Sequence, residues 1–427
     1  MKIDLITLGC SKNLVDSERL LRQLEATGYQ VEHDSNNPTG EIAIINTCGF
    51  IGDAKEESIN TILQFAQRKT QGKLKQLYVM GCLSERYLKE LVTEISEVDK
   101  FYGKFNYMEL LSDLGKQYRQ DLSVERKLTT PHHYAYLKIS EGCNRFCSYC
   151  AIPLITGRHT SRPINELLDE VRWMTRQGVR EFQVIAQDLS SYGLDLYKKQ
   201  SLPELIERMA DISGVDWIRL HYAYPAQFPY DILRVMRERD NVCNYLDLAL
   251  QHISDNMLRL MRRHITKSET IELLQRIRSE VPNICIRTTM LVGHPGETID
   301  DFEELKQFIK ETKFERLGTF AYSDEEGTYS NLHYKDNISQ SEKLRRVDEI
   351  MSIQEDISLT NNTKLIGNRL KTIIDREESD FYIGRTQYDS PEVDQEVLIE
   401  KQQPLQVGDF YDIKIVNVEP FDIYGKL

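Results

Sequence analysis

The chain has 427 residues and a formal net charge of −13, with 28% charged and 40% hydrophobic residues. This length exceeds what one compact core supports, so two or three domains are expected. The acidic balance argues against direct nucleic-acid binding as the main role, because phosphate contacts require clustered Lys and Arg. It favours a basic protein partner.

The composition also argues against secreted and membrane classes. Eight cysteines in a chain of this size are not a disulfide scaffold. No apolar run approaches the length of a membrane span, and residues 1–9 contain no signal-like apolar segment. We therefore expect a cytoplasmic protein with no membrane association, in which thiols stay reduced and available to metals.

Residues 1–125 repeat a strand, a turn and a helix three times. The predicted strands are 3–8, 42–47 and 77–80, and the helical segments that follow them include 14–24, 54–68 and 85–95. This order is typical of a parallel sheet with helical crossovers, so the sequence predicts an N-terminal α/β domain.

A cysteine lies one or two residues after the end of each of these strands: Cys10, Cys48 or Cys82. Ligands collect outside the carboxyl ends of parallel strands, so we expect the three thiols to meet at one sheet edge and form a three-thiolate site. The alternative is that they are buried free cysteines, which are common. Cys243 and Cys285 fit that alternative better, because they lie at or within apolar strands rather than after them.

A second group of cysteines, Cys143, Cys147 and Cys150, has the pattern CxxxCxxC. Soft sulfur ligands select zinc or iron–sulfur clusters over hard cations. Three ligands leave one position open on a cubane cluster, whereas a structural zinc site closes with a fourth ligand. A Cys3His zinc site therefore stays open as an alternative, with three nearby histidines: His132, His133 and His159.

A polar stretch at 115–131 is predicted to be a linker, and six strand–helix units follow it over residues 132–360. The predicted strands are 134–140, 181–186, 217–222, 245–250, 284–292 and 317–322, with helices such as 164–177 and 267–280 between them. Six units predict a partial (β/α)6 barrel, and CxxxCxxC falls on the loop after its first strand. In barrels that is the catalytic face.

Other polar residues also follow barrel strands. Gln187 comes after the second strand and Gln251 after the fourth. The segment 293–298 is either a glycine turn that approaches a ligand closely or an ordinary helix start capped by Thr298 or Asp300. The densest basic run predicts a solvated helix face or a site for an anionic cofactor group. It comprises Arg259, Arg262, Arg263, His264 and Lys267.

The pattern changes to short alternating strands over residues 363–427. The predicted strands are 370–375, 381–386, 396–400 and 410–418, separated by Gly and Pro turns. They predict a small β-barrel, a shape that often binds nucleic acid. Its charge does not suit that use, because eight Lys and Arg stand against thirteen Asp and Glu, a net of −5. This balance favours docking on a basic partner.

These residues carry a resemblance to a known family. CxxxCxxC at the start of a βα barrel resembles the radical S-adenosylmethionine (SAM) enzymes. The three cysteines of a preceding α/β domain, together with a terminal β-barrel of the OB-like TRAM type, are similar to the methylthiotransferase branch, and the likeness covers essentially the whole chain. Within it, segments 9–18, 151–159, 219–225 and 388–394 resemble the members that modify a ribosomal protein. Thr156 departs from the basic residue expected there.

The resemblance implies two [4Fe–4S] clusters and a radical mechanism. Cys143, Cys147 and Cys150 would hold the cluster that binds SAM and, with one electron from a low-potential donor, generates a 5′-deoxyadenosyl radical. Tyr149 would pack near the adenine. Gln187 and Gln251 would make further contacts to SAM.

Cys10, Cys48 and Cys82 would hold a second cluster that carries the sulfur to be transferred, which a second SAM would methylate. The implied substrate is the β-carbon of an aspartate in the twelfth small-subunit ribosomal protein, a basic protein of the decoding centre, free or in the ribosome. A carbon–hydrogen bond without acidity requires such cofactor chemistry. Two alternatives stay open: methylthiolation of an adenosine in transfer RNA, and a non-catalytic binding module stabilised by zinc.

Overall fold

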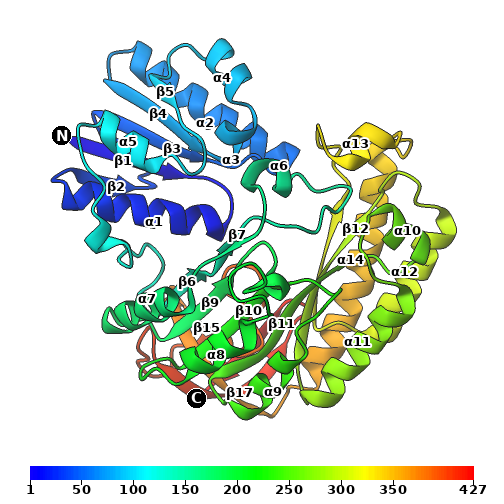
Figure 1. Ribbon diagram of the computed structural model, residues 1–427. Helices are drawn as coiled ribbons and strands as arrows, with labels where there is room; N and C mark the ends of the chain where they lie inside the picture. The colour runs from blue at the N-terminus through cyan, green and yellow to red at the C-terminus, as the bar shows by residue number, and fades with distance from the viewer.

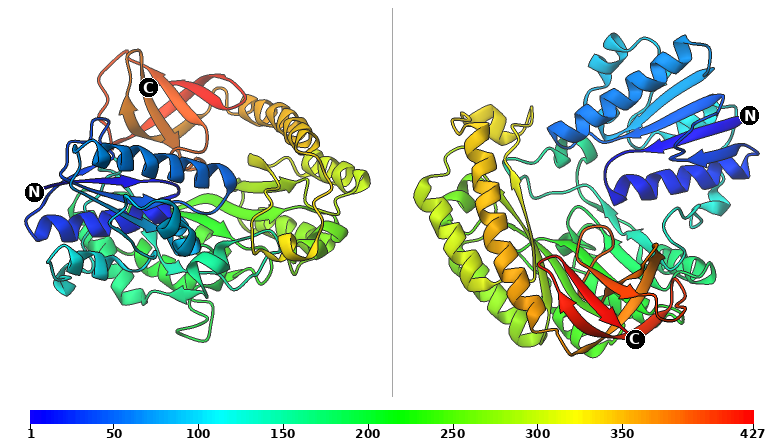
Figure 2. Two further views of the ribbon diagram at one scale, coloured as in Figure 1. Left: turned by 90° about the horizontal axis from the view of Figure 1, so that it is seen from above. Right: turned by 180° about the vertical axis from the view of Figure 1, so that it is seen from behind.

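The computed structural model describes all 427 residues and contains three main sheets (Figure 1). The N-terminal domain and the C-terminal barrel contact opposite ends of the central domain (Figures 1 and 2). No helix combines the length and the apolar character needed to cross a bilayer.

Five parallel strands form the N-terminal sheet, in the order β2-β1-β3-β4-β5. The strands are β1 Lys2–Thr7, β2 Gln30–His33, β3 Ile42–Thr47, β4 Gln76–Gly81 and β5 Lys100–Phe101. The helices are α1 Ser11–Ala26, α2 Gly52–Thr70, α3 Cys82–Arg86, α4 Leu88–Glu94 and α5 Tyr107–Asp113. β3 is central and all of its residues are buried, which explains its nearly continuous apolar sequence.

This domain differs from the prediction in two places. The segment 85–95 is not one helix, because Tyr87 has φ −125° and ψ 32° and separates α3 from α4. The edge strands β2 and β5 are not predicted by the sequence pattern, since four and two residues are too few to show a period.

The central domain is an open sheet of six parallel strands in the order β13-β12-β11-β10-β9-β6, which confirms the predicted partial barrel. The strands are β6 Tyr134–Lys138, β9 Glu181–Ile185, β10 Trp217–Ala223, β11 Val242–Gln251, β12 Cys285–Val292 and β13 Arg316–Ala321. The larger helices are α7 Ile164–Arg176, α8 Leu202–Ala210, α9 Asp231–Glu238, α11 Lys267–Glu280, α12 Ile299–Thr312 and α14 Gln340–Thr363. The short elements are β7 Ser140–Glu141, α6 Ile152–Thr156, β8 Thr160–Ser161, η2 Leu189–Ser191, α10 Asp255–Leu260 and α13 Tyr329–His333.

The predicted linker at 115–131 is packed between the first two domains. It contains a short 3-10 helix, η1, at Gln120–Leu122. The buried Arg126 pairs with Glu18 of α1 at 3.1 Å and with Glu170 of α7 at 3.1 Å. Removing one partner of a buried ion pair is strongly destabilising, so this segment joins the domains firmly and does not act as a flexible spacer.

The C-terminal strands close into a barrel in the order β14-β15-β16-β18-β17. They are β14 Arg369–Glu377, β15 Phe381–Thr386, β16 Glu396–Glu400, β17 Phe410–Val418 and β18 Asp422–Lys426. The sequence pattern predicts four of the five. It misses β18, which follows Pro420 and contains Gly425, two residue types that are unfavourable in strands.

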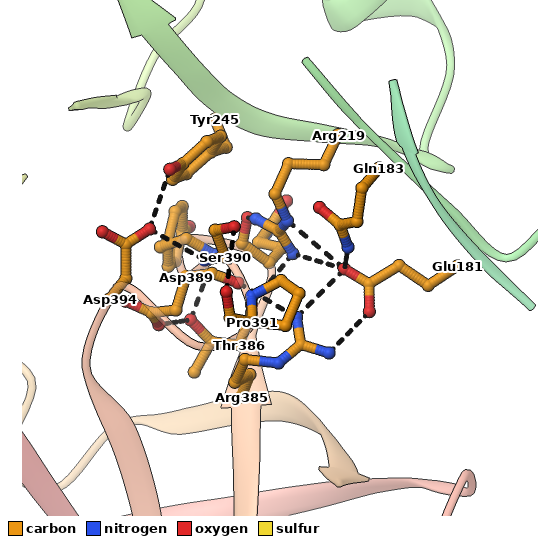
Figure 3. A network of polar contacts seen from close by, with 12 residues as sticks. Glu181, Gln183, Arg219, Tyr245, Arg385, Thr386, Asp389, Ser390, Pro391 and Asp394 are labelled. Carbon is orange, nitrogen blue, oxygen red and sulfur yellow. Dashed lines mark hydrogen bonds and ion pairs between the residues drawn. The ribbon is translucent and has the colours of Figure 1, made fainter. Parts of the chain in front are cut away.

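Buried ion pairs attach this barrel to the amino-terminal ends of the central strands (Figure 3). Glu181 of β9 accepts hydrogen bonds from Arg219 at 3.0 Å and from Arg385 of β15 at 2.7 Å. The Tyr245 hydroxyl of β11 donates to Asp394 at 2.8 Å. The loop between β15 and β16 therefore covers the lower end of the central barrel, and the N-terminal domain contacts the opposite end.

Candidate active site

Cys10, Cys48 and Cys82, here called the N-terminal trio, follow the neighbouring strands β1, β3 and β4. Cys10 precedes α1, Cys48 follows β3, and Cys82 is the first residue of α3. A Cβ atom placed on Gly9 would lie 2.8 Å from the Cys48 Sγ, so the loops of Cys10 and Cys48 touch. The structure thus brings the trio together at one sheet edge.

Asn13, which the sequence analysis did not single out, holds these loops in place. Its Nδ2 donates to the Leu8 carbonyl at 3.0 Å and to the Thr47 carbonyl at 2.9 Å. Its Oδ1 lies 3.5 Å from the Cys82 Sγ. One buried amide therefore contacts the segments that carry all three cysteines.

Cys143, Cys147 and Cys150, here called the barrel trio, lie on the loop between β7 and α6. The Cys143 Sγ accepts from the Arg145 backbone N–H at 3.4 Å. The Cys147 Sγ lies 3.2 Å from the Arg263 Nη1, and the Cys150 backbone N–H donates to the Cys147 carbonyl at 3.1 Å. This compact loop orients three thiols from a span of eight residues.

The two trios lie on segments that pack against each other. Cys82, at the start of α3, shares a small buried cluster with Ala151 and Ile155. Ala151 directly follows Cys150, and Ile155 lies on α6. The N-terminal sheet edge and the mouth of the central barrel therefore meet at the cysteines.

The thiols are costly to ionise without a counter-charge. Burial raises the pKa of Cys82 and Cys143 to about 12, and it also raises the pKa of Cys150. The Lys104 ammonium opposes this for Cys82, as the Arg263 guanidinium does for Cys150. Three soft donors in each trio, with a cation beside them, fit a metal cluster, which replaces the proton and brings positive charge.

The three histidines considered as zinc ligands do not share a site with the barrel trio. His133 Nε2 is 2.8 Å from Asp375 Oδ1, and His132 lies against Gly408, both in the C-terminal barrel. His159 Nε2 is 3.1 Å from the Ser161 Oγ. No group of three or more Cys, His, Asp or Glu side chains lies close enough to hold a single metal ion.

A buried polar network joins the domains beside the two trios. Glu141 accepts hydrogen bonds from Lys104 at 3.1 Å and from Lys138 at 2.7 Å, and Lys138 also pairs with Asp16 of α1. Burial would raise the pKa of Glu141, but the two lysines lower it to about 2. The Gln187 amide N–H also donates to Glu141, and its Oε1 is buried without a partner.

The other two predicted cofactor contacts also lie at this end of the barrel. The Tyr149 hydroxyl is 3.2 Å from the Arg263 Nη1, and its ring packs on a cluster that includes Met257 and Met261. Gln251 is the last residue of β11 and has a φ of +75°. A left-handed conformation at a non-glycine residue is uncommon and clusters at functional sites.

Arg263 is a site residue that the sequence analysis did not distinguish. It belongs to the basic run, but only 2% of it is exposed. Besides Cys147 and Tyr149, it bonds to the Ala249 carbonyl. Nothing in the run separates it from its neighbours, because its role depends on the direction in which the side chain points.

Lys12 is a second such residue. Its Nζ lies 3.3 Å above the centroid of the Tyr222 ring, at the end of β10. It has no carboxylate within ion-pair distance, whereas Arg287 pairs with Asp247 at 3.5 Å and with Asp394 at 3.2 Å. An ammonium over an aromatic face keeps its charge available for an anionic ligand.

Three family models match the chain. The radical SAM superfamily matches residues 137–309, the uncharacterized protein family UPF0004 matches residues 2–103, and the TRAM domain matches residues 366–427. The first range contains the barrel trio and the second contains the N-terminal trio.

Solved structures share the fold at low identity. The radical SAM methyltransferase TsrM from Kitasatospora setae aligns with a TM-score of 0.56 and 15% identity, over 74% of this chain and 72% of its own. The cobalamin-dependent SAM radical enzyme OxsB aligns with a TM-score of 0.54 and 12% identity, over 82% of this chain and 56% of its own. These similarities concern the fold alone.

Curated relatives match the entire chain. The ribosomal protein uS12 methylthiotransferase RimO of Phocaeicola vulgatus is 65% identical over 100% of this chain and 99% of its own. The RimO protein of Bacteroides thetaiotaomicron is 65% identical over 100% and 98%, and that of Porphyromonas gingivalis is 60% identical over 100% and 99%. The chain therefore belongs to the RimO family of radical SAM methylthiotransferases.

Proposed function

We propose that this enzyme adds a methylthio group to the β-carbon of an aspartate in ribosomal protein uS12. The carrying observation is the contact between α3, which begins at Cys82, and α6, which follows Cys150. A substrate carbon that meets a radical and then accepts sulfur must reach both sites, so the two trios must be neighbours.

The cofactors are SAM and [4Fe–4S] clusters. The barrel trio would hold the cluster that binds SAM, and the N-terminal trio would hold the cluster that carries the sulfur. When bound, these groups supply the radical that breaks an unactivated carbon–hydrogen bond and the sulfur that replaces the hydrogen.

The protein's own residues orient the cofactors. Arg263 contacts both Cys147 and Tyr149, so it fixes the edge of the barrel trio and the ring that would pack near adenine. The unpartnered Oε1 of Gln187 is free to accept a hydrogen bond from SAM. Gln251, at the end of β11, would make the third contact.

Lys12 would bind the carboxylate of the substrate aspartate. It follows Cys10 by two residues and faces the Tyr222 ring of the central barrel, so it spans the junction of the two trios. A charge-assisted hydrogen bond to the carboxylate would orient the adjacent β-carbon for reaction.

The C-terminal barrel would attract the basic substrate protein. Part of its acidic excess is used internally, because Asp375, Asp389 and Asp394 face the central barrel. Other acids lie on its exposed surface: Glu377, Glu378, Asp380, Glu400, Asp412 and Glu419. Opposite charge steers association and selects against nucleic acid. The enzyme would act in the cytoplasm, together with a low-potential electron donor.

Anaerobic reconstitution tests this function. Enzyme reconstituted with iron and sulfide, then given SAM and dithionite, should add one methylthio group to the aspartate of purified uS12, as read by mass spectrometry of peptides. Modification of an adenosine in transfer RNA instead would reverse the substrate assignment. Zinc at one or two per chain with no acid-labile sulfide would favour the binding module.

A further inference from the structure

The basic run of the sequence forms an exposed face that the proposed function does not use. This face, here called the arginine face, comprises Arg259, Arg262, His264, Tyr329 and His333. The first three line a surface depression of about 530 Å³. The Arg262 guanidinium lies 4.4 Å from the Tyr329 ring, and that ring lies 4.2 Å from the His333 ring. The end of α10, the segment after it and helix α13 thus form one continuous surface.

The arginines of this face form no ion pairs, although two carboxylates share the depression with them. Asp255 and Glu269 also line the depression, but both serve as backbone caps. The Asp255 Oδ1 accepts from the Lys267 N–H at 2.7 Å, and the Glu269 Oε2 accepts from the Thr266 N–H at 2.8 Å. Arg259 and Arg262 have no carboxylate within ion-pair distance, in a chain whose net charge is −13.

The arginine face lies directly behind the barrel trio. Ser148, between Cys147 and Cys150, donates its N–H to the Met261 carbonyl at 3.0 Å and accepts from the Ser330 N–H at 2.7 Å. Met261 adjoins Arg262, and Ser330 adjoins Tyr329. Both halves of the face are therefore hydrogen-bonded to the loop that would hold the first cluster.

One buried side chain separates the surface from a cluster ligand. Arg263 lies between Arg262 and His264 in the chain, and its Nη1 is 3.2 Å from the Cys147 Sγ. Two other sides are covered: α3 packs on α6, and the C-terminal barrel covers the lower end of the strands. In Figure 1, α10 and α13 lie on the side away from the N-terminus.

We propose that the arginine face docks an acidic, low-potential electron-transfer protein, which delivers one electron through this thin layer to the first cluster. The donor is oxidised by one electron and the cluster is reduced by one. The inference rests on the proposed role of the barrel trio. Electron-transfer encounters use small interfaces, so a few unpaired charges around two aromatic rings suffice for docking.

The test compares two sources of electrons. The double variant Arg259→Glu, Arg262→Glu and the wild type are reconstituted, and 5′-deoxyadenosine formation is measured with dithionite and with a purified acidic flavodoxin kept reduced by its reductase. We expect the flavodoxin-driven rate to fall at least tenfold and the dithionite-driven rate to stay unchanged. The wild-type flavodoxin rate should also fall as salt rises.

A matched control reverses two exposed arginines on remote helices, Arg172→Glu and Arg237→Glu, and should keep both rates. Equal flavodoxin-driven rates in the double variant and the wild type would overturn the docking proposal. An equal loss with both reductants would also overturn it, since the face would then serve substrate binding or folding. No dithionite-driven 5′-deoxyadenosine in the wild type would instead overturn the proposed function.

Discussion

The two ends of the central barrel both bury charged side chains but differ in how completely these are paired. At the end covered by the C-terminal barrel, the buried atoms without a partner belong to His133 and Gln395, whereas five charged residues have every buried polar atom hydrogen-bonded. They are Glu181, Arg219, Asp375, Arg385 and Asp389. At the mouth, four polar residues each keep one buried atom without a partner. They are Asp16, Arg145, Gln187 and Arg263.

Aromatic side chains show the same difference. At the covered end, Trp217 is 2% exposed and meets the Phe410 ring edge-on, with 4.7 Å between centroids. At the mouth, Phe146 is 48% exposed and Phe320 is 57% exposed. Unpaired polar atoms and exposed rings lower stability, so they are retained where a ligand completes them. The covered end stabilises the fold, and the mouth is left incomplete for chemistry.

The largest effect is expected from breaking the N-terminal trio alone. Cys82→Ala should abolish methylthio transfer but keep SAM cleavage to 5′-deoxyadenosine, because the barrel trio is intact. Peptide mass and chromatography of the nucleoside give the two readouts. Cys243→Ala, which removes a buried thiol at the covered end, should keep both activities. Loss of both in Cys82→Ala would contradict two separate sites.

Removing the central carboxylate of the covered end should cost stability. Glu181→Ala leaves the Arg219 and Arg385 guanidinium groups buried without their carboxylate partner. Breaking a buried ion pair in this way lowers the free energy of unfolding by about 3–5 kcal/mol. Urea unfolding followed by tryptophan fluorescence measures this, because Trp217 lies at the same interface. Glu207→Ala, at an exposed ion pair, should lower the free energy of unfolding far less, because exposed ion pairs contribute little to stability. An equal loss of stability in Glu181→Ala and Glu207→Ala would show that the ion pairs of Glu181 do not hold the C-terminal barrel on the central domain.

Acid should weaken the same end. Burial would raise the pKa of Glu181 from its ordinary 4.5, but Arg385 and Arg219 lower it to about 2. The resulting stabilisation is complete above pH 4.5 and is lost as the pH falls towards 2, since the unfolded chain binds the proton more readily. Unfolding measured between pH 5 and 3 should show a shallower pH dependence in Glu181→Gln. An unchanged slope would assign the acid sensitivity to other carboxyls.

At the mouth, Lys12→Met should weaken substrate binding without changing the fold. Loss of a hydrogen bond to a charged group costs about 1.5–3 kcal/mol, which is roughly a tenfold to hundredfold rise in KM for uS12. SAM cleavage without substrate should not change. Lys414→Met, on the exposed surface of the C-terminal barrel, is the control. A KM equal to that of the wild type would remove Lys12 from substrate recognition.

The smallest effect is expected at Thr298. The structure makes it the N-cap of α12, with its Oγ1 accepting from the Asp301 N–H at 3.1 Å in a capping box. Thr298→Ala should therefore cost about 1 kcal/mol of stability, and Thr298→Ser should restore it. SAM cleavage should be unchanged in both. If Thr298→Ala lost SAM binding but kept the stability of the wild type, the alternative that residues 293–298 form a ligand-binding turn would be favoured.

Much of the fold could be predicted because its patterns are local. Strand, turn and helix recur within short windows, and a cysteine shortly after each of three parallel strands predicts a shared edge. CxxxCxxC is likewise complete within eight residues. The amphipathic segment 267–280 becomes α11 with the same bounds. Departures occur where a turn interrupts a pattern, as at Tyr87, or where a strand is very short, as at β5.

The sequence by itself therefore determined three domains and two groups of thiols, because helix and strand periods and loop positions need no knowledge of distant residues. Only the tertiary structure decided which charged side chains contact the cysteines, which pair with one another and which stay at the surface. Arg263 turns inward to Cys147 while Arg262 stays at the surface, and Asp394 serves Arg287 instead of a partner protein. Arg263 and Cys147, and likewise Arg287 and Asp394, lie 107 or more positions apart in the sequence. The helix and strand periods do not predict which of two residues so far apart will come into contact.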